Sequence, residues 1–323
     1  MIRKRIGIEI GTATVKIAVC KGSSILSLAS ARIPEGLIRD GRVTAPAAMT
    51  AFLKTLLQEN HIRGGQCALV LPAAITICQH MTLPIMGESE LKLNLPFEFK
   101  EYVGSEGDAY DYDYIVEGIH DGVMSLYAAA ARRDAVEEYR DLFRQAGLHL
   151  KIATPPEMAW LNLIARKEPL PDKLAILDIG HQSTQLSIFA NGNYVMGKEI
   201  ELAGRSFDEI IAGEAQVDLH TARTRKETGP APTESIRQCC HALALEIRKT
   251  VNFYNYSGAA EDAPLVELYF CGGGSLLAPL REAIASTTGM TLHPIHSLLD
   301  LENCPKDSAL ICAIAAGAAL QTE

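Results

Sequence analysis

The sequence lacks an excess of basic residues. Its 323 residues include 30 lysines and arginines against 39 aspartates and glutamates, which gives a net charge of -9. Neutralisation of phosphates by lysine and arginine supplies most of a protein's affinity for nucleic acid. An acidic chain without a basic face is therefore a poor candidate for DNA or RNA binding, and we expect no nucleic-acid partner.

The eight cysteines follow no metal-binding or disulfide pattern. No C-x-x-C pair occurs and no histidine stands at metal-binding spacing, which argues against a zinc site. Cys239 and Cys240 are adjacent, an arrangement that does not favour a simple structural disulfide. These features predict reduced thiols, as in a cytosolic protein.

No apolar run is long enough to cross a membrane. After a basic start, Glu9 interrupts the first apolar run, so no signal peptide is predicted. The most apolar segment, ALICAIAAGAAL at residues 309–320, is shorter than the roughly 20 residues of a membrane-spanning helix. Its small residues suit close helix packing. We therefore expect a soluble protein with no direct membrane insertion, and its length suggests about two domains.

The chain contains two copies of one motif. The segment IGIEIGTATVKIAV at residues 6–19 resembles LAILDIGHQSTQLSIF at residues 174–189. Each copy reads as a buried strand with an acidic residue, an apolar residue, a glycine, hydroxyl residues and a second strand. The aligned pairs are Glu9 with Asp178, Gly11 with Gly180, and Thr14 with Ser183. Repetition half a chain apart favours duplicated halves that face each other over two unrelated hairpins.

Both loops have the composition of a phosphate-binding turn. A glycine lets the backbone approach phosphate closely, and successive N–H groups can point at the anion. The carboxylates cannot bind phosphate, but they can hold waters of a Mg²⁺ ion, which keeps most of its hydration shell. The hydroxyl donors are Thr12, Thr14, Ser183 and Thr184, the positive charge is Lys16, and the carboxylates are Glu9 and Asp178.

A third loop is rich in glycine. Gly272, Gly273 and Gly274 follow a strand that starts near Leu265 and precede a helix from about Leu276. An open turn at a helix N-terminus suits a purine, a ribose or a phosphate. Taken alone, this pattern is equally typical of a tight turn.

A match to the Walker pattern G-x-x-x-x-G-K is misleading. It runs from Gly192 to Lys198, but Glu199 stands where a serine or threonine is required. The preceding ANGN is a hairpin-turn signal, and the following EIEL alternates like a strand. We predict a β-hairpin here, because a P-loop needs a strand, a loop and then a helix.

The two loops and the CGGGS segment resemble, in this order, the actin-like ATPase superfamily. Within it the chain is similar to the PilM family of type IV pilus assembly proteins, which is related to FtsA. The resemblance implies an α/β fold of two RNase H-like halves around a nucleotide cleft, with a small α/β subdomain inserted in the first half. The implied divisions are residues 1–73, 153–173 and 301–323 for the first subdomain, 74–152 for the insert, 174–204 and 262–300 for the second subdomain, and 205–261 for a helical nucleotide-capping subdomain.

The resemblance also implies roles for single residues. Glu157 matches a water-orienting residue, Gly204 lies near phosphate, and Lys226 matches a lysine that grips ribose and base. Three positions depart from the family pattern, since Glu9 replaces an aspartate, Gln182 a glycine, and Arg223 a glutamate. The longer side chain of Glu9 must sit about 1–1.5 Å further out or fold back, and such a displacement can cost about 100-fold in rate. We therefore expect ATP or ADP with Mg²⁺ to bind, with Glu157, Glu9 and Asp178 as catalytic candidates and slow or absent hydrolysis.

The implied function is a cytoplasmic, nucleotide-loaded scaffold at the inner face of the membrane. Its expected partner is the short N-terminal peptide of a PilN-like inner-membrane protein, with other platform proteins or the assembly ATPase as further candidates. A sugar or acyl kinase of the same superfamily is an alternative, although the chain has no Asn-Asp signature for a general base and no zinc signature. An FtsA-like division protein is another, although no basic amphipathic tail follows the last apolar segment.

Overall fold

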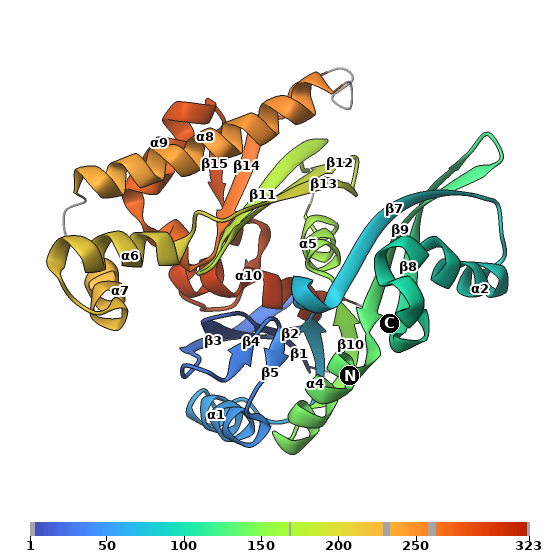
Figure 1. The fold of residues 1–323 in the computed structure, drawn as a ribbon, viewed down its shortest axis with the longest axis horizontal. Helices are drawn as coiled ribbons and strands as arrows, with labels where there is room; N and C mark the ends of the chain where they lie inside the picture. Colours follow the sequence, from blue (N-terminus) through green and yellow to red (C-terminus); the bar gives the residue numbers. More distant parts are fainter. Residues whose placement is uncertain (1–3, 168, 229–232, 258–262, 322–323) are drawn as a thin grey trace. The chain divides into compact units, whose positions relative to one another are not determined.

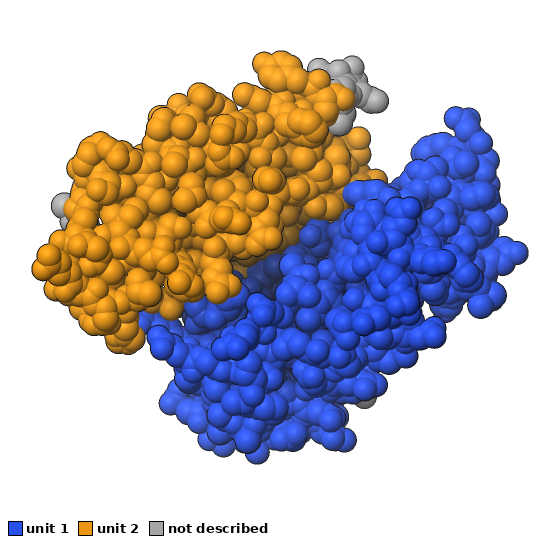
Figure 2. All heavy atoms as spheres, viewed as in Figure 1, with its two compact units in different colours: residues 1–22, 29–159, 314–323 blue, residues 23–28, 160–313 orange. Residues whose placement is uncertain are grey.

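The computed structural model describes residues 4–167, 169–228, 233–257 and 263–321 (Figure 1). Contacts divide the chain into two compact units (Figure 2). The first comprises residues 1–22, 29–159 and 314–323, and the second residues 23–28 and 160–313. The expected subdomain boundary at residues 261–262 lies outside the described residues.

The N-terminal strands belong to a six-stranded sheet. Its order is β10 (His149–Thr154), β6 (Gln66–Val70), β1 (Lys4–Ile10), β2 (Thr14–Lys21), β3 (Ser24–Arg32) and β16 (Asp300–Leu301). β1 and β2 form an antiparallel hairpin, whereas β6 runs parallel to β1 and to β10. Two short strands, β4 (Ile38–Arg39) and β5 (Arg42–Val43), make a separate ribbon.

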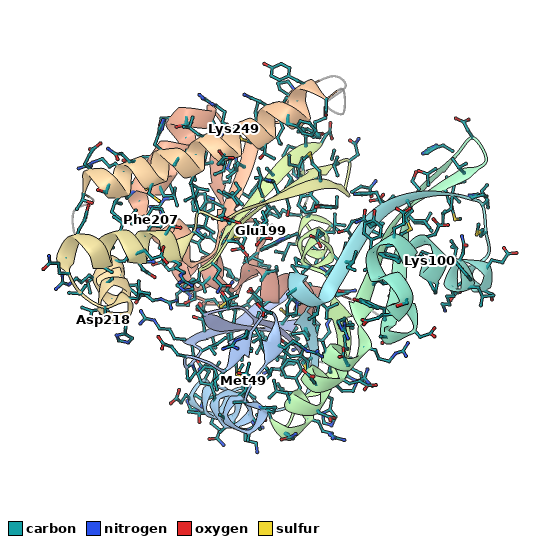
Figure 3. All side chains as sticks on the ribbon, viewed as in Figure 1. Met49, Lys100, Glu199, Phe207, Asp218 and Lys249 are labelled. Atoms are coloured by element: carbon teal, nitrogen blue, oxygen red, sulfur yellow. The ribbon has the colours of Figure 1, made fainter. Side chains whose placement is uncertain are left out.

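Alternating side chains of β1 and β2 bury both faces of this hairpin. Ile6, Ile8 and Ile10 join a core with α1 (Pro46–Glu59) and α4 (Arg133–Gln145), where Met49 is fully buried (Figure 3). Gly7 faces the other way, against α10 (Lys306–Leu320): a Cβ on Gly7 would lie 1.8 Å from the carbonyl oxygen of Ala315. The expectation that the small residues of this last helix allow close packing is thus confirmed.

A second, three-stranded sheet projects from the first unit. Its order is β7 (Thr76–Pro84), β9 (Val123–Arg132) and β8 (Tyr110–His120), all antiparallel. The helices α2 (Glu88–Glu98) and α3 (Lys100–Val103) and the turns η1 (Ala73–Ile75) and η2 (Gly104–Ala109) complete this part. Leu95, Phe99 and Val103 pack on Ala128 and Ala130, so the two helices cover one face of the sheet.

The two elements that follow β9, α4 and β10, pack against the six-stranded sheet or pair with it. β10 pairs with β6, and α4 buries Val136, Tyr139 and Phe143 in the core around β1. Gly147, with φ 85°, follows the end of α4. We therefore propose that the inserted subdomain consists of the three-stranded sheet with α2 and α3, and that it ends near Arg132 rather than at residue 152.

The second unit has a five-stranded sheet whose first two strands along the chain form an antiparallel hairpin, as in the six-stranded sheet. Its order is β13 (Asn193–Ile200), β12 (Thr184–Ala190), β11 (Lys173–Ile179), β14 (Glu267–Cys271) and β15 (Thr291–Pro294). β11 and β12 form an antiparallel hairpin and β14 runs parallel to β11, as β6 does to β1. The helical elements are α5 (Pro156–Ile164), which starts in the first unit, α6 (Gly204–Ala215), α7 (Leu219–Thr228), α8 (Glu234–Tyr256), η3 (Gly273–Leu276), α9 (Ala278–Thr288) and η4 (Ile295–Leu298).

Candidate nucleotide-binding site

The two predicted phosphate loops have the same backbone turn. The N–H of Gly11 donates to the carbonyl of Thr14 over 3.0 Å, and the N–H of Gly180 donates to that of Ser183 over 3.1 Å. Each turn joins two antiparallel strands, β1 to β2 and β11 to β12. Because each glycine uses its own N–H inside the turn, the donors for an anion must come from the residues that follow it.

Glu9 folds back onto its own hairpin. Its Oε2 lies 2.7 Å from Nζ of Lys16, and both side chains are largely buried. The two residues are cross-strand partners, so the pair is built into the register of β1 and β2. Oε1 stays beside the loop, 3.4 Å from the position that a Cβ of Gly11 would take. The extra methylene of the glutamate is thus used to reach Lys16, whose positive charge is balanced within the loop.

The carboxylate of Asp178 lies in a different environment from that of Glu9. Among the described residues, its Oδ1 is buried and has no hydrogen-bond partner. A buried carboxylate oxygen without a donor is costly unless a ligand, an ion or water satisfies it. Of the two acidic residues expected to face Mg²⁺, Asp178 therefore fits a water-mediated metal contact better than the ion-paired Glu9 does.

The glycines of the third loop pack on the end of β11. Gly272 has φ 82°, and a Cβ there would lie 2.3 Å from Oδ1 of Asp178. A Cβ on Gly274 would lie 2.3 Å from Cγ2 of Ile179, whereas one on Gly273 would meet no atom of the described residues within 4 Å. Gly272 and Gly274 are thus required for backbone packing, and Gly273 borders open space. The predicted β-hairpin at the Walker-like match is confirmed, since Asn191 and Gly192 form its turn with positive φ.

Gly204 and Lys226 meet beside the second loop. The N–H of Gly204 donates to the carbonyl of Gly180 over 3.0 Å, and Nζ of Lys226 donates to the carbonyl of Gly204 over 2.7 Å. Nζ also lies 2.5 Å from Oδ1 of Asp208, which is almost fully buried on α6. The lysine is therefore anchored by two oxygens, and the start of α6 is bonded to the second predicted phosphate loop.

Asp208 contacts the candidate site and was not among the residues predicted from the sequence. Nδ1 of His181 lies 3.8 Å from its other oxygen. Burial lowers the pKa of His181 to about 4, with Arg223, Lys226 and Arg205 adding to the effect, so the imidazole is neutral at pH 7. Phe207, the neighbour of Asp208, is buried on α6 (Figure 3), and no pattern in the sequence marks Asp208 as the partner of Lys226.

Thr184 differs from the other candidate hydroxyls in its burial and its hydrogen bond. Its side chain is fully buried, and Oγ1 donates to the carbonyl of Leu202 over 2.7 Å. In this structure the hydroxyl proton is used to hold the segment after β13, and the role of Thr184 as a phosphate donor stays a prediction. Thr12, Thr14 and Ser183 remain at the two turns, where the sequence placed them.

Glu157 lies in the first turn of α5, in an environment that disfavours its charge. Burial raises the pKa of its carboxyl, and a hydrogen bond from Tyr127 offsets part of this effect. Its Oε2 is buried and unpartnered among the described residues. The carboxyl therefore combines a buried free oxygen with a raised pKa, which are features typical of functional carboxyl groups.

Replacing Glu157 with glutamine should stabilise the protein at neutral pH. A native pKa above the unfolded value of about 4.3 means that the stabilising contribution of Glu157 is full below that value and is lost as the pH rises through the native pKa. The uncharged Glu157→Gln side chain escapes this loss, so we expect higher stability at pH 7–8 and a smaller difference near pH 5. Urea unfolding across this range measures it, with the exposed Glu35→Gln as control. Equal or lower stability of Glu157→Gln at pH 8 would contradict the expectation.

Comparison with known proteins identifies the family. The model of the type IV pilus assembly protein PilM matches residues 7–311. A chain of the solved PilM-PilN type IV pilus biogenesis complex is 27% identical, with a TM-score of 0.84 over 98% of this chain and 97% of that chain.

Two more distant structures share the fold. The ethanolamine utilization protein EutJ from Carboxydothermus hydrogenoformans is 15% identical, with a TM-score of 0.62 over 98% of this chain and 89% of that one. MreB5 of Spiroplasma citri bound to AMPPNP is 16% identical, with a TM-score of 0.55 over 97% and 94%. The actin-like fold predicted from the sequence is thereby confirmed. Within the described ranges, no helix has both the length and the apolarity to cross a membrane. With a family model that spans nearly all of its length, the chain belongs to the PilM family of type IV pilus assembly proteins.

Proposed function

We propose that the protein is an ATP-binding scaffold of the type IV pilus platform, which binds the N-terminal peptide of a PilN-like membrane protein. The observation that carries this proposal is the likeness to the PilM-PilN complex across 98% of the chain. Attachment to such a partner would hold the protein at the inner face of the membrane. The family match favours this function over a small-molecule kinase or a division protein.

The loops supply the groups that a nucleotide needs. Thr12, Thr14 and Ser183 would donate to phosphates, and Gly273 would face the adenosine. Asp178, with its free buried oxygen, would accept hydrogen bonds from waters of Mg²⁺. Mg²⁺ would neutralise phosphate charge when bound. The positive charge of Lys16 would be shared between the phosphates and Glu9, its ion-pair partner. This pairing supports a site that holds ATP in place but hydrolyses it slowly.

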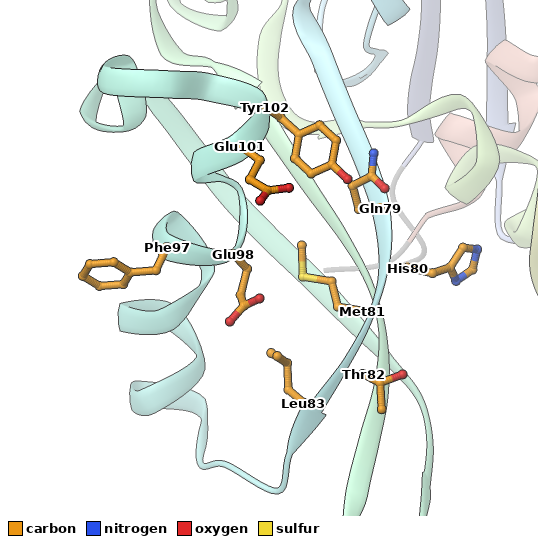
Figure 4. Close-up of a pocket in the computed structure, with 9 residues that line it drawn as sticks. All are labelled: Gln79, His80, Met81, Thr82, Leu83, Phe97, Glu98, Glu101 and Tyr102. Carbon is orange, nitrogen blue, oxygen red and sulfur yellow. The ribbon is translucent and has the colours of Figure 1, made fainter.

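A groove of about 400 Å³ beside β7 is the proposed place for the peptide (Figure 4). Its lining residues are Gln79, His80, Met81, Thr82 and Leu83 on β7, and Phe97, Glu98, Glu101 and Tyr102 on or beside α2 and α3. Phe97 and Tyr102 are 72% and 52% exposed, so apolar surface is available for a ligand. Among the described strands, β7 is an edge of its sheet and pairs only with β9. An edge strand offers free N–H and C=O groups to an extended peptide.

Two acidic side chains set the expected chemistry of that peptide. Glu98 and Glu101 stand on the helical side of the groove, and neither has a cationic partner among the ion pairs of the described residues. Opposite charge across an interface speeds association and selects the partner. We therefore expect an extended segment that alternates apolar side chains with lysine or arginine.

Reversing these charges should weaken peptide binding. Each exposed charge pair contributes up to about 1 kcal/mol, so Glu98→Lys with Glu101→Lys is expected to raise the Kd about tenfold at low salt. The difference should shrink as salt screens the charges. Isothermal titration with the N-terminal peptide of the PilN-like protein from the same genome, with MgATP present, measures the effect.

The matched control is Glu35→Lys with Glu59→Lys, which makes the same charge change on exposed residues outside the groove. An equal loss of affinity in both double variants would remove the groove from the proposal. Absence of any peptide binding by the unaltered protein, combined with phosphorylation of a sugar or acyl acceptor, would overturn the scaffold function itself.

A further inference from the structure

The two faces of the inserted sheet have different neighbours. Gln79, Met81 and Leu83 point toward α2 and α3, whereas His80 points to the opposite side of β7 (Figure 4). The cross-strand partner of His80 is Tyr127 on β9, and their rings lie 4.9 Å apart. The strand that borders the groove on one face thus contacts Tyr127 on the other.

Tyr127 connects this back face to Glu157. Its side chain is only 4% exposed. Its hydroxyl is hydrogen-bonded both to Glu157 and to Cys78, the latter on β7. Burial, reinforced by the nearby Glu157, raises the pKa of the Cys78 thiol to about 12, so this thiol stays protonated. A phenol has one proton and can also accept. The hydrogen bond from Tyr127 lowers the pKa of both Cys78 and Glu157, so the one phenolic proton can be donated either to the sulfur or to the carboxylate.

We propose that Tyr127 is a positioning residue that orients Glu157 and thereby couples the groove beside β7 to the nucleotide site. The proposal rests on the proposed function, because it needs a peptide in the groove and a nucleotide near Glu157. A peptide that pairs with β7 restrains the strand that carries both Cys78 and His80. These two residues contact Tyr127 from the same strand, so the restraint reaches the hydroxyl that holds Glu157.

Such coupling is reciprocal. If the peptide favours one orientation of Glu157 and the nucleotide favours the same one, each ligand tightens the other by the same factor. Removal of the Tyr127 hydroxyl should abolish this factor and leave each separate affinity nearly unchanged. If Tyr127 had only a structural role, removal of its hydroxyl would change the separate affinities for peptide and nucleotide. The ratio of the peptide Kd without and with MgATP would then stay the same.

The test measures the peptide Kd with and without MgATP. In the unaltered protein we expect a ratio of about five or more, within the usual range of coupling between sites. In Tyr127→Phe the ratio should fall to about one, with the ATP affinity in the absence of peptide changed by less than about twofold. Tyr112→Phe is the matched control, because its hydroxyl belongs to the same insert but donates to the carbonyl of Gly107. It should keep the ratio of the unaltered protein.

A second variant keeps the test valid if Tyr127→Phe folds poorly. Glu157→Gln keeps Tyr127 but weakens its charge-assisted hydrogen bond, and it should lower the ratio as well. The double variant, Tyr127→Phe with Glu157→Gln, should show a ratio no lower than that of Tyr127→Phe alone, because both changes remove the same interaction. The relay is overturned by a ratio near one in the unaltered protein, by a normal ratio in Tyr127→Phe, or by independent effects in the double variant. Failure of the peptide to bind at all overturns the proposed function instead.

Discussion

Replacing Gly273 with tryptophan should lower the affinity for MgATP by at least about tenfold, a loss of about 1.4 kcal/mol or more. Within the part of the chain that the structure describes, a Cβ at this position meets no atom within 4 Å, and the φ of Gly273 is not in the left-handed region. The protein can therefore accept the side chain without strain. An indole in that open space would occupy the volume that we assign to the adenosine.

The measurement is titration with a fluorescent ATP analogue, accompanied by thermal unfolding. Gly213→Trp is the control, because Gly213 is also exposed, on α6, with nothing within 4 Å of its Cβ position. We expect both variants to keep the Tm of the unaltered protein and only Gly273→Trp to lose nucleotide. Unchanged affinity in Gly273→Trp would remove the third loop from the site.

The second large effect is expected in the core. Gly7→Ala should cost about 3 kcal/mol of unfolding free energy, at the upper end of overpacking effects, and lower the Tm by about 5–10 °C. The new Cβ would lie 1.8 Å from the carbonyl oxygen of Ala315 and 2.7 Å from the amide nitrogen of Ala319. Both atoms belong to the backbone of α10, which cannot rotate away as a side chain does.

Gly65→Ala is the control in the same unit. The closest atom to its Cβ would be Cδ1 of Ile6 at 4.0 Å, an ordinary contact. Its stability should change by less than about 1 kcal/mol. Thermal and urea unfolding of the two variants give the comparison. A Tm of Gly7→Ala within two degrees of the control would mean that β1 and α10 are packed less closely than described.

Local patterns in the sequence predicted the hairpins, whereas the actin-like fold was implied by the family resemblance. The duplicated strand, acid, glycine and strand order became two hairpins with the same Gly11 and Gly180 turns. The Walker-like match at Gly192 was correctly assigned to a hairpin, because its turn and strand signals lie within a few residues of one another. Such features depend on neighbouring residues, and one sequence is enough to interpret them.

Features that depend on partners from distant segments were not predictable. Glu9 was expected near a metal, but its pairing with Lys16 depends on the cross-strand register. Thr184 has the composition of a phosphate donor, yet the fold brings the carbonyl of Leu202 to its hydroxyl. Asp208 acquires its role only when Lys226 of the next helix reaches it. The Mg²⁺ contacts and the catalytic roles of Glu157, Glu9 and Asp178 stay predictions.

The contact between Gly7 and α10 has a consequence for how the protein is made. Arg5 on β1 donates to the carbonyl of Gln321, a residue 316 positions later, and α10 covers the face of β1 that Gly7 leaves open. On the ribosome, the first sheet therefore emerges long before its covering helix is synthesised. Closing so long a loop is slow, and β1 and β2 must wait with one face exposed to water. We expect the first unit to reach its native state only after α10 has been synthesised, so the nascent chain exposes an uncovered sheet to which chaperones can bind.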